Sequence, residues 1–175
     1  LLEACQPHID APYAIFGHSM GAGIAWELAM AAAHTGRAPT HLFLSARRAP
    51  GTPMVHPPLF ALPKEQLIEE VERLYGALPR ALKKHPALLR NALPTMRADF
   101  RLLDTWIPTM GVLDDVPVTV FGGETDRAVP HASLQPWTER TTGPMDLHIM
   151  EGGHFFVRTS PATRTKVSEI LQRYV

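Results

Sequence analysis

The chain has 175 residues, 45% of them hydrophobic, which is typical of one globular domain. Its 17 basic and 17 acidic residues balance, so no net charge favours nucleic acid or an anionic membrane surface as a partner. The single cysteine, Cys5, excludes an internal disulfide and suggests a reducing compartment. We find no signal peptide and no apolar run of membrane-spanning length, and we therefore expect a cytoplasmic protein without membrane partners.

A short strand is predicted at residues 13–16, after what we expect to be the end of a helix over residues 1–9. Residues 17–21 are Gly-His-Ser-Met-Gly, and the Ala-rich residues 22–35 favour a helix. Strand, G-x-S-x-G and helix in this order are typical of the nucleophile elbow of the α/β-hydrolases. We expect both glycines to be needed, because the turn leaves no room for side chains beside Ser19. The alternative is an ordinary strand–helix turn that happens to hold a serine.

Three further strands are predicted at residues 42–45, 118–121 and 147–150, with helices over 133–140 and from about residue 161. Because helices connect the strands, we expect an α/β fold with a mostly parallel sheet covered on both faces, the α/β-hydrolase fold. Such a sheet has several strands ahead of the elbow. We therefore expect the chain to be the C-terminal portion of a longer protein whose N-terminal strands are missing here. The elbow strand would then have an unpaired edge.

A helical insertion is predicted over residues 46–112, between two parts of the core at residues 1–45 and 113–175. The connection is far longer than usual for neighbouring strands. It contains two apolar stripes at helical spacing, and Pro94 is expected to break or kink the second helix. Because the insertion lies beside an exposed nucleophile, we interpret it as a lid that covers an apolar substrate chamber. The alternative is that the stripes only pack on each other and on the core. The stripes consist of Leu67, Ile68, Val71, Leu74 and Tyr75, and of Leu89, Leu93, Met96, Phe100 and Leu103.

Three residues that suit nucleophilic catalysis, Ser19, Asp126 and His154, each follow a predicted strand. Their order along the chain is the order of the α/β-hydrolases, and the ends of parallel strands meet at one sheet edge. Ser19 would attack an acyl carbon, His154 would carry its proton, and Asp126 would orient the imidazole. The backbone N–H of Met20 is expected to supply one oxyanion-hole donor, with a second from a loop upstream of the chain.

Other histidines and carboxylates fit these roles less well. His18 lies too close to Ser19 in sequence to approach its hydroxyl, His148 lies within a strand, and His131 is expected at the surface. Asp114 and Asp115 precede a strand instead of following it, and Asp104 belongs to the insertion. No cluster has the spacing of metal ligands and no phosphate-binding or dinucleotide-binding glycine motif is present, so we expect neither a metal nor a cofactor.

Four segments together resemble the type II thioesterases, the stand-alone enzymes that serve nonribosomal peptide and polyketide synthases. They are Gly-His-Ser-Met-Gly-Ala at residues 17–22, Ser-Ala-Arg-Arg-Ala-Pro at 45–50, Leu-Pro-Thr-Met-Arg-Ala-Asp-Phe at 93–100 and Gly-Gly-His-Phe-Phe at 152–156. The resemblance extends along essentially the whole chain and assigns the catalytic triad to Ser19, Asp126 and His154. Ala46, where the family has glycine, and Trp106, where it has tyrosine, are departures outside the triad.

The resemblance implies hydrolysis of acyl groups from the phosphopantetheine arm of carrier domains, an editing reaction, by a protein that is monomeric when full length. Carrier domains are typically acidic, so cations are candidates to steer docking, although each alone is more simply a solvated side chain. The candidates are Arg47, Arg48, Lys83, Lys84 and Arg90.

Two other functions stay open. One is an esterase or lipase that acts on small diffusible esters, which a comparison of carrier-bound thioesters with free esters would separate from a thioesterase. The other is a catalytically silent hydrolase-fold module that binds a ligand or a protein. A serine-directed fluorophosphonate would leave such a module unmodified at Ser19.

Overall fold

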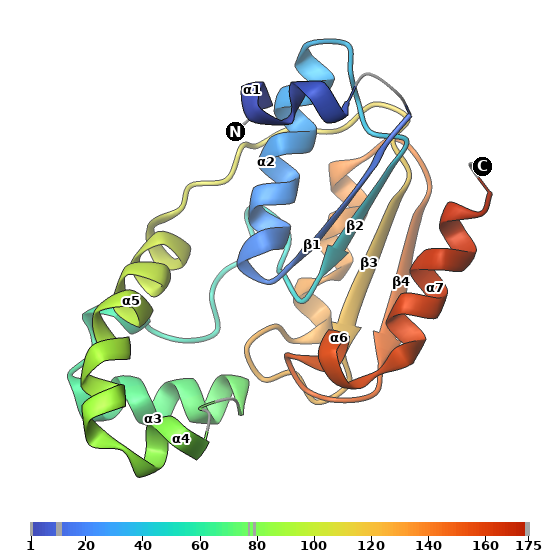
Figure 1. Cartoon of the computed structure of the whole chain (residues 1–175). Helices are drawn as coiled ribbons and strands as arrows, with labels where there is room; N and C mark the ends of the chain where they lie inside the picture. The colour runs from blue at the N-terminus through green and yellow to red at the C-terminus, as the bar shows by residue number, and fades with distance from the viewer. Residues whose placement is uncertain (1, 10–11, 77, 79, 174–175) are drawn as a thin grey trace.

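The computed structural model describes residues 2–9, 12–76, 78 and 80–173. Its centre is a four-stranded parallel sheet of order β1-β2-β3-β4 (Figure 1), which confirms the predicted α/β class. The strands are β1 (Ala14–His18), β2 (His41–Ser45), β3 (Val118–Gly123) and β4 (Met145–Met150). Within the described residues β1 pairs on one side only, so its outer edge is open, and Phe16 is 43% exposed there.

Both faces of the sheet are covered, and the alternation of side chains along the strands divides the core into two clusters. Leu42 and Leu44 of β2 point to the cluster under α2 (Met20–His34), whereas Phe43 points to the cluster under α7 (Pro161–Leu171). Burial on both faces explains why β2 is apolar throughout its centre. The remaining short elements of the core are α1 (Leu2–Cys5), η1 (Gln6–His8), η3 (His131–Ser133), η4 (Gln135–Arg140) and α6 (Phe156–Thr159).

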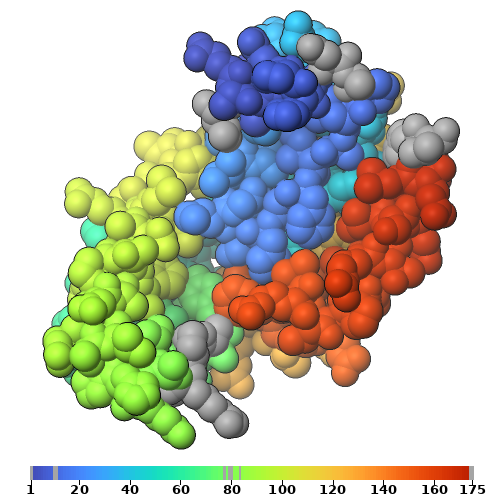
Figure 2. All heavy atoms as spheres, viewed as in Figure 1, coloured from blue at the N-terminus to red at the C-terminus, as the bar shows by residue number. Residues whose placement is uncertain are grey.

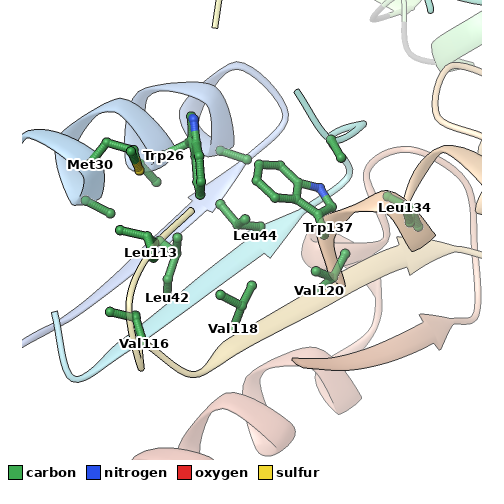
Figure 3. Packing of buried hydrophobic residues seen from close by; sticks show 14 of the residues in the cluster. Trp26, Met30, Leu42, Leu44, Leu113, Val116, Val118, Val120, Leu134 and Trp137 are labelled. Carbon is green, nitrogen blue, oxygen red and sulfur yellow. The ribbon is translucent and has the colours of Figure 1, made fainter. Parts of the chain in front are cut away.

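Two tryptophans that lie far apart in the sequence meet in the first cluster. Trp26 of α2 and Trp137 of η4 are fully buried, and their ring centroids lie 5.2 Å apart in an edge-on arrangement, on either side of Leu44 (Figure 3). Trp26 also donates its indole N–H to the carbonyl of Thr109 at 3.0 Å. The small alanines of α2 pack in the same cluster, together with the Trp pair.

The segment between β2 and β3 folds into helices that lie apart from the sheet (Figure 1). They are η2 (Leu59–Ala61), α3 (Lys64–Tyr75), α4 (Arg80–Lys84) and α5 (Pro86–Thr105). Their apolar stripes bury a cluster of their own around Leu67 and Leu74. Of the break or kink expected at Pro94, the break does not occur, because α5 continues through the proline; the kink stays a prediction. Because Leu93 is buried and Phe100 packs on the same cluster, tertiary contacts offset the hydrogen bond that proline removes.

Candidate active site

Ser19 occupies a strained turn between β1 and α2. Its φ of 53° and ψ of −115° lie outside the regions that non-glycine residues normally adopt. Its N–H donates to the carbonyl of Ser45 at 2.8 Å, which ties the turn to the end of β2. Strain of this kind persists only where the surrounding structure holds it, and here it lifts the serine hydroxyl above the end of the sheet.

The two glycines of the motif differ in what they contribute. A Cβ on Gly17 would lie 2.3 Å from the carbonyl oxygen of Gly21 and 2.6 Å from Cα of Ala22, so β1 and the first turn of α2 approach too closely for any side chain. A Cβ on Gly21 would meet nothing within 4 Å. The expectation that both flanks of Ser19 exclude side chains is therefore wrong for Gly21.

The structure brings Ser19, His154 and Asp126 into hydrogen-bond contact. Nδ1 of His154 lies 2.8 Å from Oδ2 of Asp126, and Nε2 of His154 lies 2.8 Å from Oγ of Ser19. Because an ionised carboxylate only accepts, Nδ1 carries the ring proton and Nε2 is left to accept the serine proton. Both His154 and Asp126 are buried, at 2% and 7% exposure. This geometry is that of a general base held in the correct tautomer.

Asp126 is itself held in place by the loop that follows β3. Its Oδ1 accepts the backbone N–H groups of Ala128 at 2.9 Å and Val129 at 3.1 Å, which leaves Oδ2 for His154. The loop thus fixes the carboxylate before any substrate arrives.

Three aromatic side chains surround the His154 imidazole. The ring of Tyr75, from α3, lies edge-on at a centroid distance of 4.7 Å, and Phe155 lies perpendicular at 5.1 Å. His18 lies at 5.4 Å on the core side, and its Nδ1 is 2.8 Å from Oγ of Ser45. Burial lowers the pKa of His18 to about 4, so this second imidazole is neutral near pH 7 and does not oppose a positive charge on His154.

A cavity of about 620 Å³ opens over Ser19 and His154. Most of its wall comes from the helices between β2 and β3, and in Figure 2 the green atoms of these helices lie against the orange atoms that follow β4. The lining is mostly apolar, with Thr95 and Asp99 as polar members from the insertion, which suits a hydrocarbon chain next to the nucleophile. Residues from the insertion include Val71, Leu78, Leu82, Met96, Phe100 and Leu103.

The backbone N–H of Met20 belongs to the first residue of α2. The first N–H groups of a helix have no acceptor within the helix, and the helix dipole favours negative charge at that end. Met20 also lines the cavity with Ser19, and the role of its N–H as an oxyanion donor stays a prediction.

The competing groups lie away from the Ser19 hydroxyl or serve other contacts. His148 lies within β4 and stacks on Phe121, and His131 is exposed, with Nε2 3.1 Å from the carbonyl oxygen of Gly123. Asp104, near the end of α5, accepts the N–H of Phe60 at 3.3 Å. In the part of the chain that the structure describes, no group of three or more His, Cys, Asp or Glu residues is placed to hold a metal.

Sequence reasoning missed how several residues face the site. Tyr75 was expected only as part of an apolar stripe, yet its ring contacts the imidazole of His154. Arg47 was expected to be either an ordinary solvated cation or a cation that steers docking. Both expectations are wrong, because the side chain is 7% exposed and its guanidinium lies 4.7 Å from the ring of Trp106. The Arg-Arg-Ala-Pro segment was a signal, but burial of its first arginine depends on a tryptophan from a distant element.

A parallel sheet with a serine on a strained strand–helix turn, next to a histidine and an aspartate from later strand ends, defines an α/β fold of the serine-hydrolase type. The model of the Thioesterase domain family matches residues 1–174, and the chain belongs to this family. No helix in the described ranges combines the length and hydrophobicity that a bilayer crossing demands.

The chain is similar to individual members of this family over most of its length. The Gramicidin S biosynthesis protein GrsT of Aneurinibacillus migulanus is 36% identical over 159 residues, covering 90% of this chain and 62% of GrsT. Among solved structures, the type II thioesterase BorB from the borrelidin biosynthetic cluster is 30% identical, with a TM-score of 0.79 over 98% of this chain and 67% of BorB. The thioesterase RedJ from the prodiginine pathway of Streptomyces coelicolor is 31% identical, with a TM-score of 0.80 over 97% of this chain and 66% of RedJ. The chain thus spans about two thirds of each of these three proteins.

Proposed function

We propose that this chain carries the catalytic residues of an editing thioesterase, which releases acyl groups from phosphopantetheinyl carrier domains of a nonribosomal peptide or polyketide synthase. The observation that supports the proposal most is the relay from Ser19 through His154 to Asp126, with both hydrogen bonds at 2.8 Å, on the floor of an apolar cavity. Membership of the Thioesterase domain family and similarity to type II thioesterases support the reaction class.

The proposed reaction has two steps. Oγ of Ser19 attacks the thioester carbonyl carbon while its proton passes to Nε2 of His154, and the tetrahedral intermediate expels the pantetheine sulfur, which takes that proton and leaves as a thiol. Water then attacks the acyl-serine with His154 again as base, which returns the serine and releases a carboxylic acid. Asp126 stays ionised and stabilises the imidazolium in both steps.

The oxyanion of each intermediate would be stabilised by the N–H of Met20, at the positive end of α2. In α/β-hydrolases the second N–H donor comes from a loop that precedes the nucleophile elbow in chain order. A thiolate is a good leaving group, so the reaction needs less acid assistance from His154 than ester cleavage does.

Residues 46–112 are proposed to act as the lid of this site, and residues 1–45 and 113–175 as the catalytic core. The lid supplies most of the apolar cavity wall, and Tyr75 reaches from it to the His154 ring. An apolar chamber discriminates weakly between acyl chains that differ by a methylene, which suits an editing enzyme. Exposed Lys84 and Arg90 remain candidates to meet an acidic carrier domain. We propose a cytoplasmic protein that is monomeric at full length.

The test compares one acyl group in two forms, a thioester on a carrier domain and a small oxygen ester. The purified protein is given butyryl groups as a thioester on a phosphopantetheinylated carrier domain and as a simple oxygen ester, and initial rates are measured. We expect kcat/KM to be higher for the carrier thioester, with hydrolysis lost in Ser19→Ala and kept in Ser168→Ala, a matched change on the exposed face of α7. Faster cleavage of the oxygen ester would instead indicate an esterase.

Covalent labelling separates an enzyme from a silent module. A fluorophosphonate is expected to modify wild-type protein and Ser168→Ala but not Ser19→Ala, as measured by intact mass. A folded protein that stays unlabelled at Ser19 would refute the proposed nucleophile.

A further inference from the structure

Two cavities of very different size meet at Ser19 and His154. One is the apolar chamber of about 620 Å³, and the other, which we call the small cavity, has a volume of about 30 Å³. A volume of this order holds about one or two water molecules and is too small for an acyl chain. Two further cavities beside His154, of about 650 and 260 Å³, do not include Ser19 in their walls. The small cavity therefore offers water a position next to both the serine and the histidine.

The wall of the small cavity is charged, unlike that of the chamber. Asp104 of α5 lines it together with Arg47 and Arg48, which follow the end of β2. Nε and Nη2 of Arg47 are buried with no hydrogen-bond partner, and buried N–H groups of this kind normally bond to ordered water. Arg47 also borders a mostly apolar cavity of about 220 Å³, where water finds fewer polar partners. The small cavity thus has both the size and the polar wall of a water site.

Asp104 is held so that one carboxylate oxygen is left for such a water. Its Oδ2 accepts the backbone N–H of Phe60 at 3.3 Å, and the carbonyl of Phe60 accepts Nη1 of Arg97, also from α5, at 2.7 Å. Among the described residues no donor bonds to Oδ1 of Asp104. Because a carboxylate oxygen accepts hydrogen bonds, Oδ1 is able to take one O–H of a water and to fix its orientation.

The second half of the proposed reaction needs a water at this place. Once Ser19 is acylated, the acyl chain fills the apolar chamber, whose wall offers water few partners. The attacking water has to reach the acyl carbon on Oγ of Ser19 and to pass a proton to Nε2 of His154. The small cavity adjoins both residues and carries an acceptor, Asp104, on the rest of its wall.

We propose that the small cavity supplies the water that hydrolyses the acyl-serine, and that Asp104 is the positioning residue for this water. The inference rests on the proposed thioesterase function. One O–H of the water is donated to Asp104 and the other faces Nε2 of His154. The water oxygen bonds to the acyl carbon as its proton passes to Nε2. That proton then goes to Oγ of Ser19 as the acyl–oxygen bond breaks, which leaves a carboxylic acid and the free serine.

The experiment measures the two halves of the reaction separately. Butyryl-N-acetylcysteamine is the substrate; acylation is followed as thiol release in the first turnover, and deacylation as the decay of butyryl-Ser19 by quenching and intact mass. Asp104→Leu removes the acceptor at nearly constant volume, whereas Asp104→Asn keeps an oxygen that can accept. The matched control is Asp114→Leu, at an exposed aspartate ahead of β3.

We expect only deacylation to respond. Decay of butyryl-Ser19 should slow about 10- to 100-fold in Asp104→Leu, the effect of removing one hydrogen bond to a charged group, so that the acyl-enzyme accumulates. It should slow less in Asp104→Asn and not at all in Asp114→Leu, while first-turnover thiol release stays close to the wild-type rate in all three. Unchanged decay in folded Asp104→Leu, or equal slowing of both halves, overturns the role of Asp104.

A measurement on the wild-type protein covers the case in which Asp104→Leu does not fold. With 1-propanol added, butyric acid and propyl butyrate are compared per mole of each nucleophile. Water should be preferred, because the small cavity has no room for the alcohol. A higher reactivity of propanol overturns the inference and leaves the thioesterase function standing. If wild-type protein releases no thiol and forms no acyl-enzyme, the proposed function itself is overturned.

Discussion

Gly17 and Gly21 flank Ser19 symmetrically in the sequence, but the structure predicts opposite results when each is replaced by alanine. In Gly17→Ala the new Cβ would lie 2.3 Å from a backbone oxygen of α2 and 2.6 Å from a backbone carbon. Ordinary carbon contacts are about 3.5–4.0 Å, so the start of α2 has to move by roughly 1 Å. Overpacking of this kind costs about 1–3 kcal/mol. A displacement of that size at the nucleophile lowers activity about 100-fold.

Gly21→Ala is the matched control. Its Cβ has open space, and Gly21 lies in the first turn of α2 without a positive φ. Alanine is a better helix former than glycine by up to about 1 kcal/mol, so stability should stay constant or rise. The cavity over Ser19 does not include this residue.

Urea unfolding followed by circular dichroism, together with initial rates on a carrier-bound thioester, tests the pair. We expect Gly17→Ala to lose both stability and rate, and Gly21→Ala to keep both. Equal damage from the two substitutions, or a Gly17→Ala protein as stable and active as wild type, would show that the packing of α2 on β1 is not what places the serine.

Three further predictions concern the relay, the half-buried imidazole of His18 and the core. Asp126→Asn should lower kcat by about 10⁴-fold with KM little changed, because an amide that donates to Nδ1 leaves His154 in the wrong tautomer. If the variant reached the wild-type rate at raised pH, this explanation would be contradicted. Since burial lowers the pKa of His18 to about 4 while the unfolded value is 6.5, the unfolded state binds more protons between these values, and the free energy of unfolding should fall as pH drops from 6.5 towards 4. Urea titrations should show a shallower fall in His18→Gln, and an equal fall would exclude His18 as a source. Trp137→Ala should destabilise the protein by about 3–5 kcal/mol, because the indole is fully buried. It should also disturb the segment around Arg47 more than Trp137→Phe does, because the indole anchors the carbonyl of Arg47. Equal thermal midpoints for wild type and Trp137→Ala would refute this packing role.

Much of the architecture was predictable because its signals are local. The short run of β-branched and aromatic residues before Ser19, the helix after it and the later strand ends are recognised from neighbouring residues alone. The chain order of Ser19, Asp126 and His154 follows from the same segments. The amphipathic stripes of α3 and α5 also predicted which faces are buried. At Pro94 local reasoning left a break or a kink open, and the structure excludes the break, because α5 continues through the proline.

Only the tertiary structure could decide which elements contact each other and which side chains are buried between them. The sequence by itself determined the strand–turn–helix, the parallel α/β sheet and the three residues that reach one edge. The folded chain decided that Gly17 but not Gly21 lies against backbone, that Tyr75 lies against His154, and that Arg47 is buried on Trp106 instead of facing solvent. Period and motif report on neighbours along the chain, whereas burial and pairing depend on contacts between elements many residues apart.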